Sequence, residues 1–449
     1  MLTIIQRLAQ ITVNTNYASI SEHERHQIKR VVLDRMSSAL AAARLNIRQE
    51  LITHIKNTTK NHESTIWGIS GKVSHHHAAL LNGVISAHLE YSPHNSMIPS
   101  LLALAEIRKT TGKELITSLS AGYKVERIVN RLLASAVEKR GMHWPAYLST
   151  FPATAASCRL LGLDIKQTAD SMSLVGCISP VTPFEAFTKG TPAKDIYDGW
   201  GSYLGVLTAE LGELGINGPV NLFEGERGLG KIWLDQTPTD KMIAYAFKPI
   251  KSTEVRHGIK AYPSCTAAHP TLTAVEKLLK TNTICIEEIE RIEVITYHFG
   301  ADLSNSSTPD TSISAKVNIP FLTAILLKHG KIDPSYTEPP HLYDPETLAL
   351  AKKINVTSLL NKNDSLFGRT RFAEITLTMK DGSKIASKSD KIKWSIPHQA
   401  SDEELTDKYR TLVADYLSTH QRDQLQIKIM TVESLSDVSE IVKLTIPNT

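Results

Sequence analysis

Several features that would direct a functional assignment are missing from this chain of 449 residues. Its four cysteines, Cys158, Cys177, Cys265 and Cys285, lie far apart and form neither a CxxC pair nor the spacing of a disulfide-rich domain. No stretch reaches the roughly 18 uninterrupted apolar residues of a membrane-spanning helix. The first residues lack the basic segment, the long apolar segment and the cleavage site of a secretion signal. We therefore predict a cytoplasmic protein with reduced thiols and no membrane span.

Charge of one sign is also scarce, since 50 basic residues face 46 acidic ones and the net charge is +4. So small and scattered an excess excludes the basic surface of a nucleic-acid binder, although it is compatible with a locally basic pocket for a carboxylate. The chain has no GxGxxG dinucleotide fingerprint and no GxSxG nucleophile elbow. The segment GERGLGKI is not a phosphate-binding loop, because Ile232 stands where the magnesium-binding hydroxyl belongs.

What the chain does contain is a long helical pattern followed by a mixed one. The length predicts more than one domain, and the first 250 residues carry Ala and Leu at helical spacing with glycine stops. Near residue 285 the pattern changes, and residues 373–379 alternate as in a strand before an Asp-Gly hairpin turn. Helix returns at Ser401. We predict a mainly α protein, with an all-helical body of residues 1–268 and 399–449 and an inserted, smaller α+β lid domain of residues 269–398.

The segment KAYPSCTAAHP, at the predicted junction of body and lid, collects Lys260, Cys265 and His269 within ten positions. Clefts form at such junctions. Pro263 favours extended backbone for the residue before it, so the side chains point in different directions. Lys260 could hold a carboxylate, and Cys265 could exchange a proton if a neighbouring cation lowers its pKa. The alternative is an ordinary turn with a small buried cysteine.

Three further stretches place ionisable side chains at breaks in the helical pattern. AHLEYSPHNS offers Glu90 and His94 as an acid and a base, and GMHWPAY places His143 in an irregular loop as a proton shuttle. TPAKDIYDGWGSYLG puts Lys194 and Tyr197 one helical turn apart. A lysine at the start of a glycine-rich helix could bind a substrate carboxylate. A polar loop or a solvated side chain is the alternative in each case, and spacing alone favours it.

The run SHHHAAL, residues 74–80, does not predict a metal site. Adjacent histidines in regular structure cannot all face one ion, and no acidic or cysteine residue is spaced as a zinc partner. We therefore expect no metal ligands in this chain.

Five stretches, in their order along the chain, resemble the MmgE/PrpD family, which includes 2-methylcitrate dehydratase, cis-aconitate decarboxylase and iminodisuccinate epimerase. They are NGVISAHLEY with IPSLLALAE, GMHWPAYLSTFPATAASCRLLGLD, AKDIYDGWGSYLGVLTAELGELGINGPVNLFEGERGL, KAYPSCTAAHP and SAKVNIPFLTAILL. The resemblance covers most of residues 1–445 and rests on the ordered set. It implies a helical body with an α/β lid, an active site between them, a homodimer, and neither metal nor organic cofactor.

The resemblance also implies roles for individual residues. Glu90 matches an acidic position where the family usually has Asp, and His94 matches the His that follows it. His143 matches the His of a Gly-Phe-His motif. Lys194 and Lys260 match the lysines of the Lys-x-x-His-x-Gly and Lys-x-Tyr-Pro motifs.

This chain departs from the family pattern at several of these places. Cys265 stands where decarboxylase-like members have His, and Tyr197 replaces the His of Lys-x-x-His. Phe321 stands where the family has a Tyr and lacks its hydroxyl. The run Glu-Tyr-Ser-Pro from Glu90 replaces Asp-Phe-Asp-Asp, and the loop to His94 is shorter. These changes touch the pocket and argue against the substrates of the named members, and against cis-aconitate decarboxylation most of all.

We predict a cofactor-independent lyase, a hydro-lyase that acts on a small hydroxy di- or tricarboxylate and is similar to 2-methylcitrate dehydratase. Its partner is the small carboxylate substrate, with no nucleic acid and no membrane. One alternative is an epimerase that removes and returns an α-proton of a dicarboxylate, and another is a catalytically inactive family member. The predicted catalytic residues are His143, Cys265, His94 and Glu90, and the predicted substrate-binding residues are Lys194, Lys260, Tyr197, His269 and Phe321.

Overall fold

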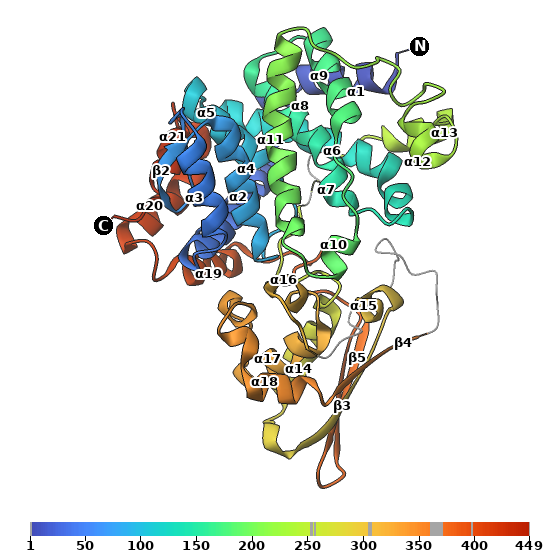
Figure 1. The fold of residues 1–449 in the computed structure, drawn as a ribbon, viewed down its shortest axis with the longest axis vertical. Helices are drawn as coiled ribbons and strands as arrows, with labels where there is room; N and C mark the ends of the chain where they lie inside the picture. The colour runs from blue at the N-terminus through green and yellow to red at the C-terminus, as the bar shows by residue number, and fades with distance from the viewer. Residues whose placement is uncertain are drawn as a thin grey trace.

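The computed structural model describes residues 2–251, 255, 257–303, 308–359, 371–396 and 398–448. Figure 1 shows a helical body in the upper part and a smaller unit of helices and strands below it, which we call the lid. The predicted fold class, a mainly α body with a small α/β domain, is confirmed.

Helices make up most of the body. Several begin with a side-chain cap, and Thr111 and Ser401 each form a full capping box with the glutamate three residues later. The body helices are α1 (Ile4–Asn14), α2 (Glu22–Arg44), α3 (Gln49–Thr58), α4 (His75–His88), α5 (Met97–Arg108), α6 (Gly112–Lys139), α7 (Trp144–Leu148), α8 (Thr150–Leu161), α9 (Ile165–Ile178), α10 (Glu185–Thr188), α11 (Ala193–Glu213), α12 (Leu229–Leu234), α13 (Asp240–Ala246), α19 (Asp402–Val413), α20 (Thr419–Met430) and α21 (Ser439–Lys443).

Helices α4 and α11 pack closely against each other near the middle of the body (Figure 1). Gly83 of α4 and Gly199 of α11 make this approach possible. A Cβ on Gly83 would lie 2.6 Å from the Gly199 Cα, and a Cβ on Gly199 would lie 2.5 Å from the Leu80 carbonyl oxygen. Any side chain at either position would push the two helices apart. These glycines therefore set the distance between the side chains of α4 and those of α11.

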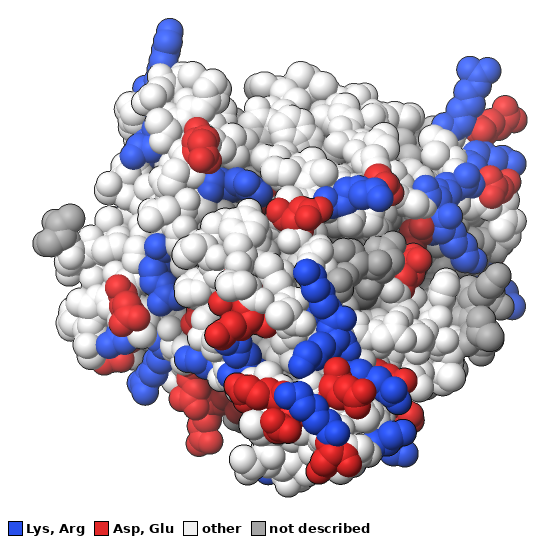
Figure 2. Space-filling view, turned by 60° about the horizontal axis from the view of Figure 1, so that its bottom comes forward, with Lys and Arg blue, Asp and Glu red and all other residues white. Residues whose placement is uncertain are grey.

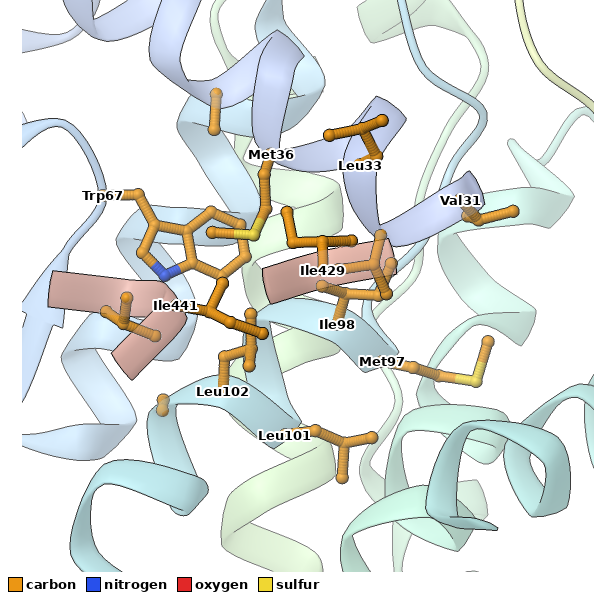
Figure 3. Close-up of a cluster of buried hydrophobic side chains, with 14 of the residues drawn as sticks. Val31, Leu33, Met36, Trp67, Met97, Ile98, Leu101, Leu102, Ile429 and Ile441 are labelled. Carbon is orange, nitrogen blue, oxygen red and sulfur yellow. The ribbon is translucent and has the colours of Figure 1, made fainter. Parts of the chain in front are cut away.

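The chain returns to the body after the lid. Side chains of α2, α5, α20 and α21 meet in one hydrophobic cluster around Trp67, as Figure 3 shows. Ile429 of α20 and Ile441 of α21 are both fully buried there. The last helices are therefore part of the body core, beside α2 and α3 in Figure 1.

One part of the body differs from the helical prediction for the first 250 residues. Strands β1 (Ser64–Ile66) and β2 (Ile69–Val73) form an antiparallel hairpin. Gly68 has φ +77° at its turn, a conformation that glycine adopts without strain. Strand β1 is buried, and the Thr65 amide and hydroxyl both bond to the Glu106 carboxylate of α5. Packing of this segment against α5 therefore favours a hairpin, although the sequence on both sides of it has a helical pattern.

The lid is a four-stranded sheet covered by helices. Its strands run in the order β4-β3-β5-β6, with β3 parallel to β4 and antiparallel to β5. The predicted strand of residues 373–379 and the hairpin turn after it are confirmed, as β5 and its antiparallel pairing with β6. Apolar residues of the sheet pack against α14 and α17 in a second hydrophobic core. The lid elements are α14 (His269–Thr281), β3 (Ile289–Thr296), α15 (His298–Asp302), α16 (Ser312–Ala315), α17 (Ile319–His329), α18 (Pro345–Ala351), β4 (Ile354–Ser358), β5 (Ala373–Met379) and β6 (Lys384–Ser389).

The surface agrees with the charge balance of the sequence. On the face shown in Figure 2, acidic and basic side chains are interspersed. In the described part of the chain, no helix has both the length and the apolar character needed to cross a bilayer. All four cysteines are free thiols.

Candidate active site

A cavity of about 310 Å³ lies between the body and the lid. The body side of its wall comes from the segment after α4 and from α6, α7 and α11, and the lid side from the segment 260–266, α15 and Arg371, just before β5. Five of the predicted site residues line it, namely Glu90, His94, His143, Lys260 and Cys265. Most of the predicted site residues, which lie far apart in the sequence, therefore line the same cavity.

Glu90 joins the two predicted carboxylate-binding lysines. Its Oε1 contacts the Lys194 Nζ at the start of α11, and its Oε2 accepts a hydrogen bond from the Lys260 Nζ at 2.6 Å. The backbone of Glu90 is left-handed, with φ +50°, directly after α4. Lys260 also donates to the Ser264 carbonyl oxygen at 3.2 Å. Two ammonium groups therefore converge on a single carboxylate at the edge of the cavity.

Both lysines are buried, with Lys194 3% and Lys260 8% exposed. Burial lowers the pKa of Lys194 to about 7, and the nearby charge of Lys260 acts in the same direction. Burial likewise lowers the pKa of Lys260 to about 8. The Glu90 carboxylate favours the ammonium forms, because opposite charges in contact stabilise each other in a buried site. Below these pKa values the cluster holds two cations and one anion, which leaves one positive charge for a ligand.

His94 adjoins a buried charged pair, Asp198 and Arg35, that was not predicted from the sequence. Its Nδ1 contacts the Asp198 Oδ1, and the Asp198 Oδ2 accepts a hydrogen bond from the Arg35 Nη2 at 2.7 Å. Arg35 also donates to the Pro93 carbonyl oxygen at 3.1 Å, which fixes the segment before His94. An aspartate on Nδ1 selects the tautomer that leaves Nε2 as the proton acceptor.

His143 lies beside His94, with the ring centroids 5.4 Å apart. It is 7% exposed and packs against the rings of Phe184, Phe187 and Tyr197. Burial, together with the charge of Lys260, lowers the pKa of His143 to about 3, so the imidazole is neutral at pH 7. Its Nδ1 is buried and has no hydrogen-bond partner within the described residues. This nitrogen therefore makes no hydrogen bond within the described residues that a ligand would have to displace.

The other predicted site residues have different surroundings. The Tyr197 hydroxyl donates to the Pro183 carbonyl oxygen at 3.0 Å, while its ring packs on His143. His269 is 1% exposed and lies edge-on to Tyr262, where it supports the segment 260–265 from behind. Phe321 is fully buried in the lid core. The structure therefore places His269 and Phe321 outside the cavity wall.

Two further ionisable residues line the cavity and had no recognisable signal in the sequence. Glu126 projects from α6, and burial raises its pKa to about 7 against the opposing charge of Arg127. Arg371 comes from the lid, just before β5. Glu126 lies within an ordinary amphipathic helix pattern, which gives no reason to separate it from a solvated residue. Asp198 did carry a signal, because it follows Lys194 by four positions on α11 and so shares its face.

A buried chain of charges joins the lid to the body beside these lysines. In the lid, the Lys316 Nζ donates to the Glu338 Oε1 at 2.5 Å. The same oxygen lies 2.9 Å from the His88 Nε2 at the end of α4, and the His88 Nδ1 lies 2.6 Å from the Asp195 Oδ2 of α11. Asp195 directly follows Lys194 in α11. These contacts hold both walls of the cavity in one arrangement.

Comparison with known proteins gives matches over most of the chain. The model of the MmgE/PrpD N-terminal domain matches residues 6–241, and that of the MmgE/PrpD C-terminal domain matches residues 262–433. The cis-aconitate decarboxylases of Mus musculus and Homo sapiens are each 23% identical to the chain and align with 93% of it, covering 87% and 89% of their own lengths. A cis-aconitate decarboxylase-like protein of Aspergillus oryzae is 20% identical, over 93% of this chain and 92% of its own.

Proposed function

We propose, since this chain belongs to the MmgE/PrpD family, that it is a lyase acting on a small di- or tricarboxylate, and that it removes water from a hydroxy acid of that class. The observation that carries the proposal is the convergence of Lys194 and Lys260 on one carboxylate, near the His143 Nδ1, which has no hydrogen-bond partner in the described part of the chain. This arrangement combines a place for a substrate carboxylate with a base for the carbon beside it.

The charge of the cavity favours an anionic substrate with more than one carboxylate. Lys194 and Lys260 exceed Glu90 by one positive charge, whereas Asp198 and Arg35 balance each other. Arg371 lines the cavity from the lid side, and Glu126, with a pKa raised to about 7, is only partly ionised at neutral pH. One substrate carboxylate would bind at the two lysines, beside Glu90 or in its place. A second would lie toward the lid.

Dehydration at this site needs three groups. The His143 Nδ1 takes the proton from the carbon beside the bound carboxylate, and the lysines stabilise the negative charge that develops on the carboxylate oxygens. The hydroxyl leaves as water after it receives a proton from the Cys265 thiol, and the double bond forms between the two carbons. Positioned acid and base groups of this kind each contribute roughly 10²–10⁴-fold in rate.

Decarboxylation is a second candidate, favoured by the cis-aconitate decarboxylases that align with 93% of this chain. In that reaction the bond to one carboxylate breaks, CO₂ leaves, and an acid protonates the carbon that retains the electron pair. Lys194 and Lys260 would hold a remaining carboxylate and stabilise the same kind of charge. The two reactions therefore use the same cations and differ in which bond to carbon breaks.

Proton NMR in D₂O separates these reactions. The purified protein is incubated with 2-methylcitrate, citrate, cis-aconitate, iminodisuccinate and related hydroxy acids, and the Lys260→Gln variant serves as the matched control. Loss of water with a new vinyl or methyl signal would support the hydro-lyase assignment. Loss of a carboxylate would overturn that assignment in favour of a decarboxylase.

Deuterium entry without any change of the carbon skeleton would replace the lyase by an epimerase. Unchanged spectra for the whole panel, from protein with native circular dichroism, would overturn the proposal. Equal turnover by the Lys260→Gln variant would overturn the assigned site.

A further inference from the structure

The far ends of α4 and α11 bring together three side chains that the sequence separates. His75 and His76 are the first two residues of α4, and Glu210 lies in the last turn of α11. From the sequence we expected no metal at these histidines, because adjacent histidines cannot all face one ion and no acidic or cysteine residue is spaced as a partner. The fold supplies Glu210 from 135 positions away along the chain, and only His75 and His76 of the three histidines contact it.

The two imidazoles approach the two oxygens of one carboxylate. The His75 Nε2 lies 2.8 Å from the Glu210 Oε1, and the His76 Nε2 lies 2.7 Å from the Glu210 Oε2. One nitrogen of each histidine and one oxygen of Glu210 all lie within 4.8 Å of one another. These separations bring the three groups close enough to share a single ion after small side-chain shifts.

Glu63 completes the arrangement from the opposite side of His75. Its Oε2 accepts hydrogen bonds from the His75 Nδ1 at 2.6 Å and from the His75 backbone amide at 3.1 Å. A carboxylate on the remote nitrogen is the usual partner of a metal-bound histidine, because it fixes the ring and its tautomer. With Nδ1 donating, the Nε2 lone pair faces a carboxylate oxygen, and a positive charge must lie between them.

The surroundings suit an ion that enters from solvent. The side chains of His75, His76 and Glu210 are 13%, 22% and 23% exposed, so the cluster is accessible without any opening of the fold. The Tyr203 ring lies 5.7 Å from the His76 ring and is stacked on Trp200, which holds one side of the cluster in place. Glu63 and Glu210 together balance the two charges of a divalent cation.

We propose that His75, His76 and Glu210 form a binding site for a divalent transition-metal ion, with Zn²⁺ as the best match. Two imidazoles and a carboxylate are a common zinc ligand set, and a water completes the tetrahedron. The site lies roughly 20 Å along α4 from the cavity, at 1.5 Å per residue. The ion therefore joins the ends of α4 and α11 and, through Glu63, the segment before β1. The proposal does not depend on the proposed function.

Metal binding to the full chain, purified without a histidine tag and treated with chelator, tests the site. Zn²⁺ affinity is measured by calorimetry, and Co²⁺ is added as a spectroscopic probe of tetrahedral coordination. We expect one saturable site per chain. The His76→Ala and Glu210→Gln variants should each lose at least about 100-fold in affinity, and Glu63→Gln about 10- to 100-fold as an outer partner.

His77→Ala is the matched control, because the His77 Nδ1 bonds to the Ser74 hydroxyl and His77 lies outside the ligand set. Its affinity should equal that of the unsubstituted chain. Absence of saturable binding to the unsubstituted chain would show that a proton, and not a metal, fills the cluster. Equal Zn²⁺ affinity in a folded His76→Ala or Glu210→Gln variant would also overturn the assignment.

Discussion

Helices α4 and α11 carry a cluster of ionisable groups at each end, and the two clusters differ in burial and in the sign of their excess charge. At the lid end, two buried lysines share one carboxylate, Glu90. At the far end, two partly exposed histidines lie between the carboxylates of Glu63 and Glu210. The same pair of helices thus presents an anion site and a cation site. The surrounding charges, and not the scaffold, decide which ligand fits.

The two ends also respond to proton concentration for different reasons. At the lid end, burial lowers the pKa values of Lys194 and Lys260 to about 7 and about 8. At the far end, burial acts to lower the pKa of His75, but the hydrogen bonds with Glu210 and Glu63 outweigh it and raise that pKa. Desolvation determines the direction of the pKa shift at the lid end, where carboxylates do not outnumber the lysines. Hydrogen bonds with charged partners determine it at the far end, where two carboxylates contact His75.

Removal of a cavity lysine should have the largest effect. We expect Lys260→Ala to lower kcat/KM by about 10³-fold, because the variant loses one of two cations that face the developing charge. Steady-state kinetics on the substrate found in the NMR panel measures the loss. Lys166→Ala is the control, since Lys166 is a solvent-exposed lysine in a surface pair, 76% exposed. Comparable kcat/KM values for the two variants would contradict the prediction, because they would show that Lys260 matters no more for turnover than a surface lysine.

Removal of Asp198 should reduce stability strongly, because Arg35 would be left as a buried cation without its partner. Their side chains are 2% and 0% exposed. Loss of one member of a buried pair costs about 3–5 kcal/mol, so Asp198→Ala should lower the free energy of unfolding in urea by that amount. Asp415, 87% exposed and 3.7 Å from Arg44, offers the matched surface pair. Asp415→Ala should cost at most about 1 kcal/mol, and similar costs for both would contradict the burial argument.

Replacement of His143 should lower turnover by about 10²-fold, the lower part of the range for a positioned base. We expect the His143→Asn variant to lose deuterium exchange from D₂O into the substrate together with turnover, because both need the same proton transfer. Retained exchange with lost turnover would assign the base to another residue. His94 or Glu126 would then be the next candidates in the cavity wall.

The sequence predicted the fold from local signals. Helical periodicity and strand alternation are local properties, and they identified the helical body, the strand of residues 373–379 and the hairpin turn after it. The hairpin at residues 64–73 was missed because its burial against α5 depends on a distant partner. The same limit applies to the sites. Arg35 and Glu210 acquire their roles from contacts across more than a hundred positions, which spacing does not encode, whereas the spacing of Asp198 from Lys194 was a signal that could have been used.

The smallest expected effect is a shift in pH dependence. Binding of an anionic substrate needs the ammonium forms of Lys194 and Lys260, which are lost as the pH rises through their pKa values of about 7 and about 8. A plot of kcat/KM against pH should therefore fall on the alkaline side of this range. In Glu90→Gln the fall should begin at lower pH, because the carboxylate no longer favours the ammonium forms. Glu90→Asp, which keeps the charge, should show a smaller shift, and an unmoved limb in Glu90→Gln would contradict the coupling.

We infer that Lys194 and Lys260 form a position for a substrate carboxylate that Glu90 fills from within the chain. Calorimetry with tricarballylate, a tricarboxylate without a hydroxyl to lose, tests this on the unsubstituted chain, Lys260→Gln and Glu90→Gln, at a pH low enough to keep both lysines protonated in every variant. We expect binding to weaken at least tenfold in Lys260→Gln and to become tighter in Glu90→Gln, because an internal competitor is removed and the site gains a positive charge. Weaker binding in Glu90→Gln, or equal binding in Lys260→Gln, would contradict it.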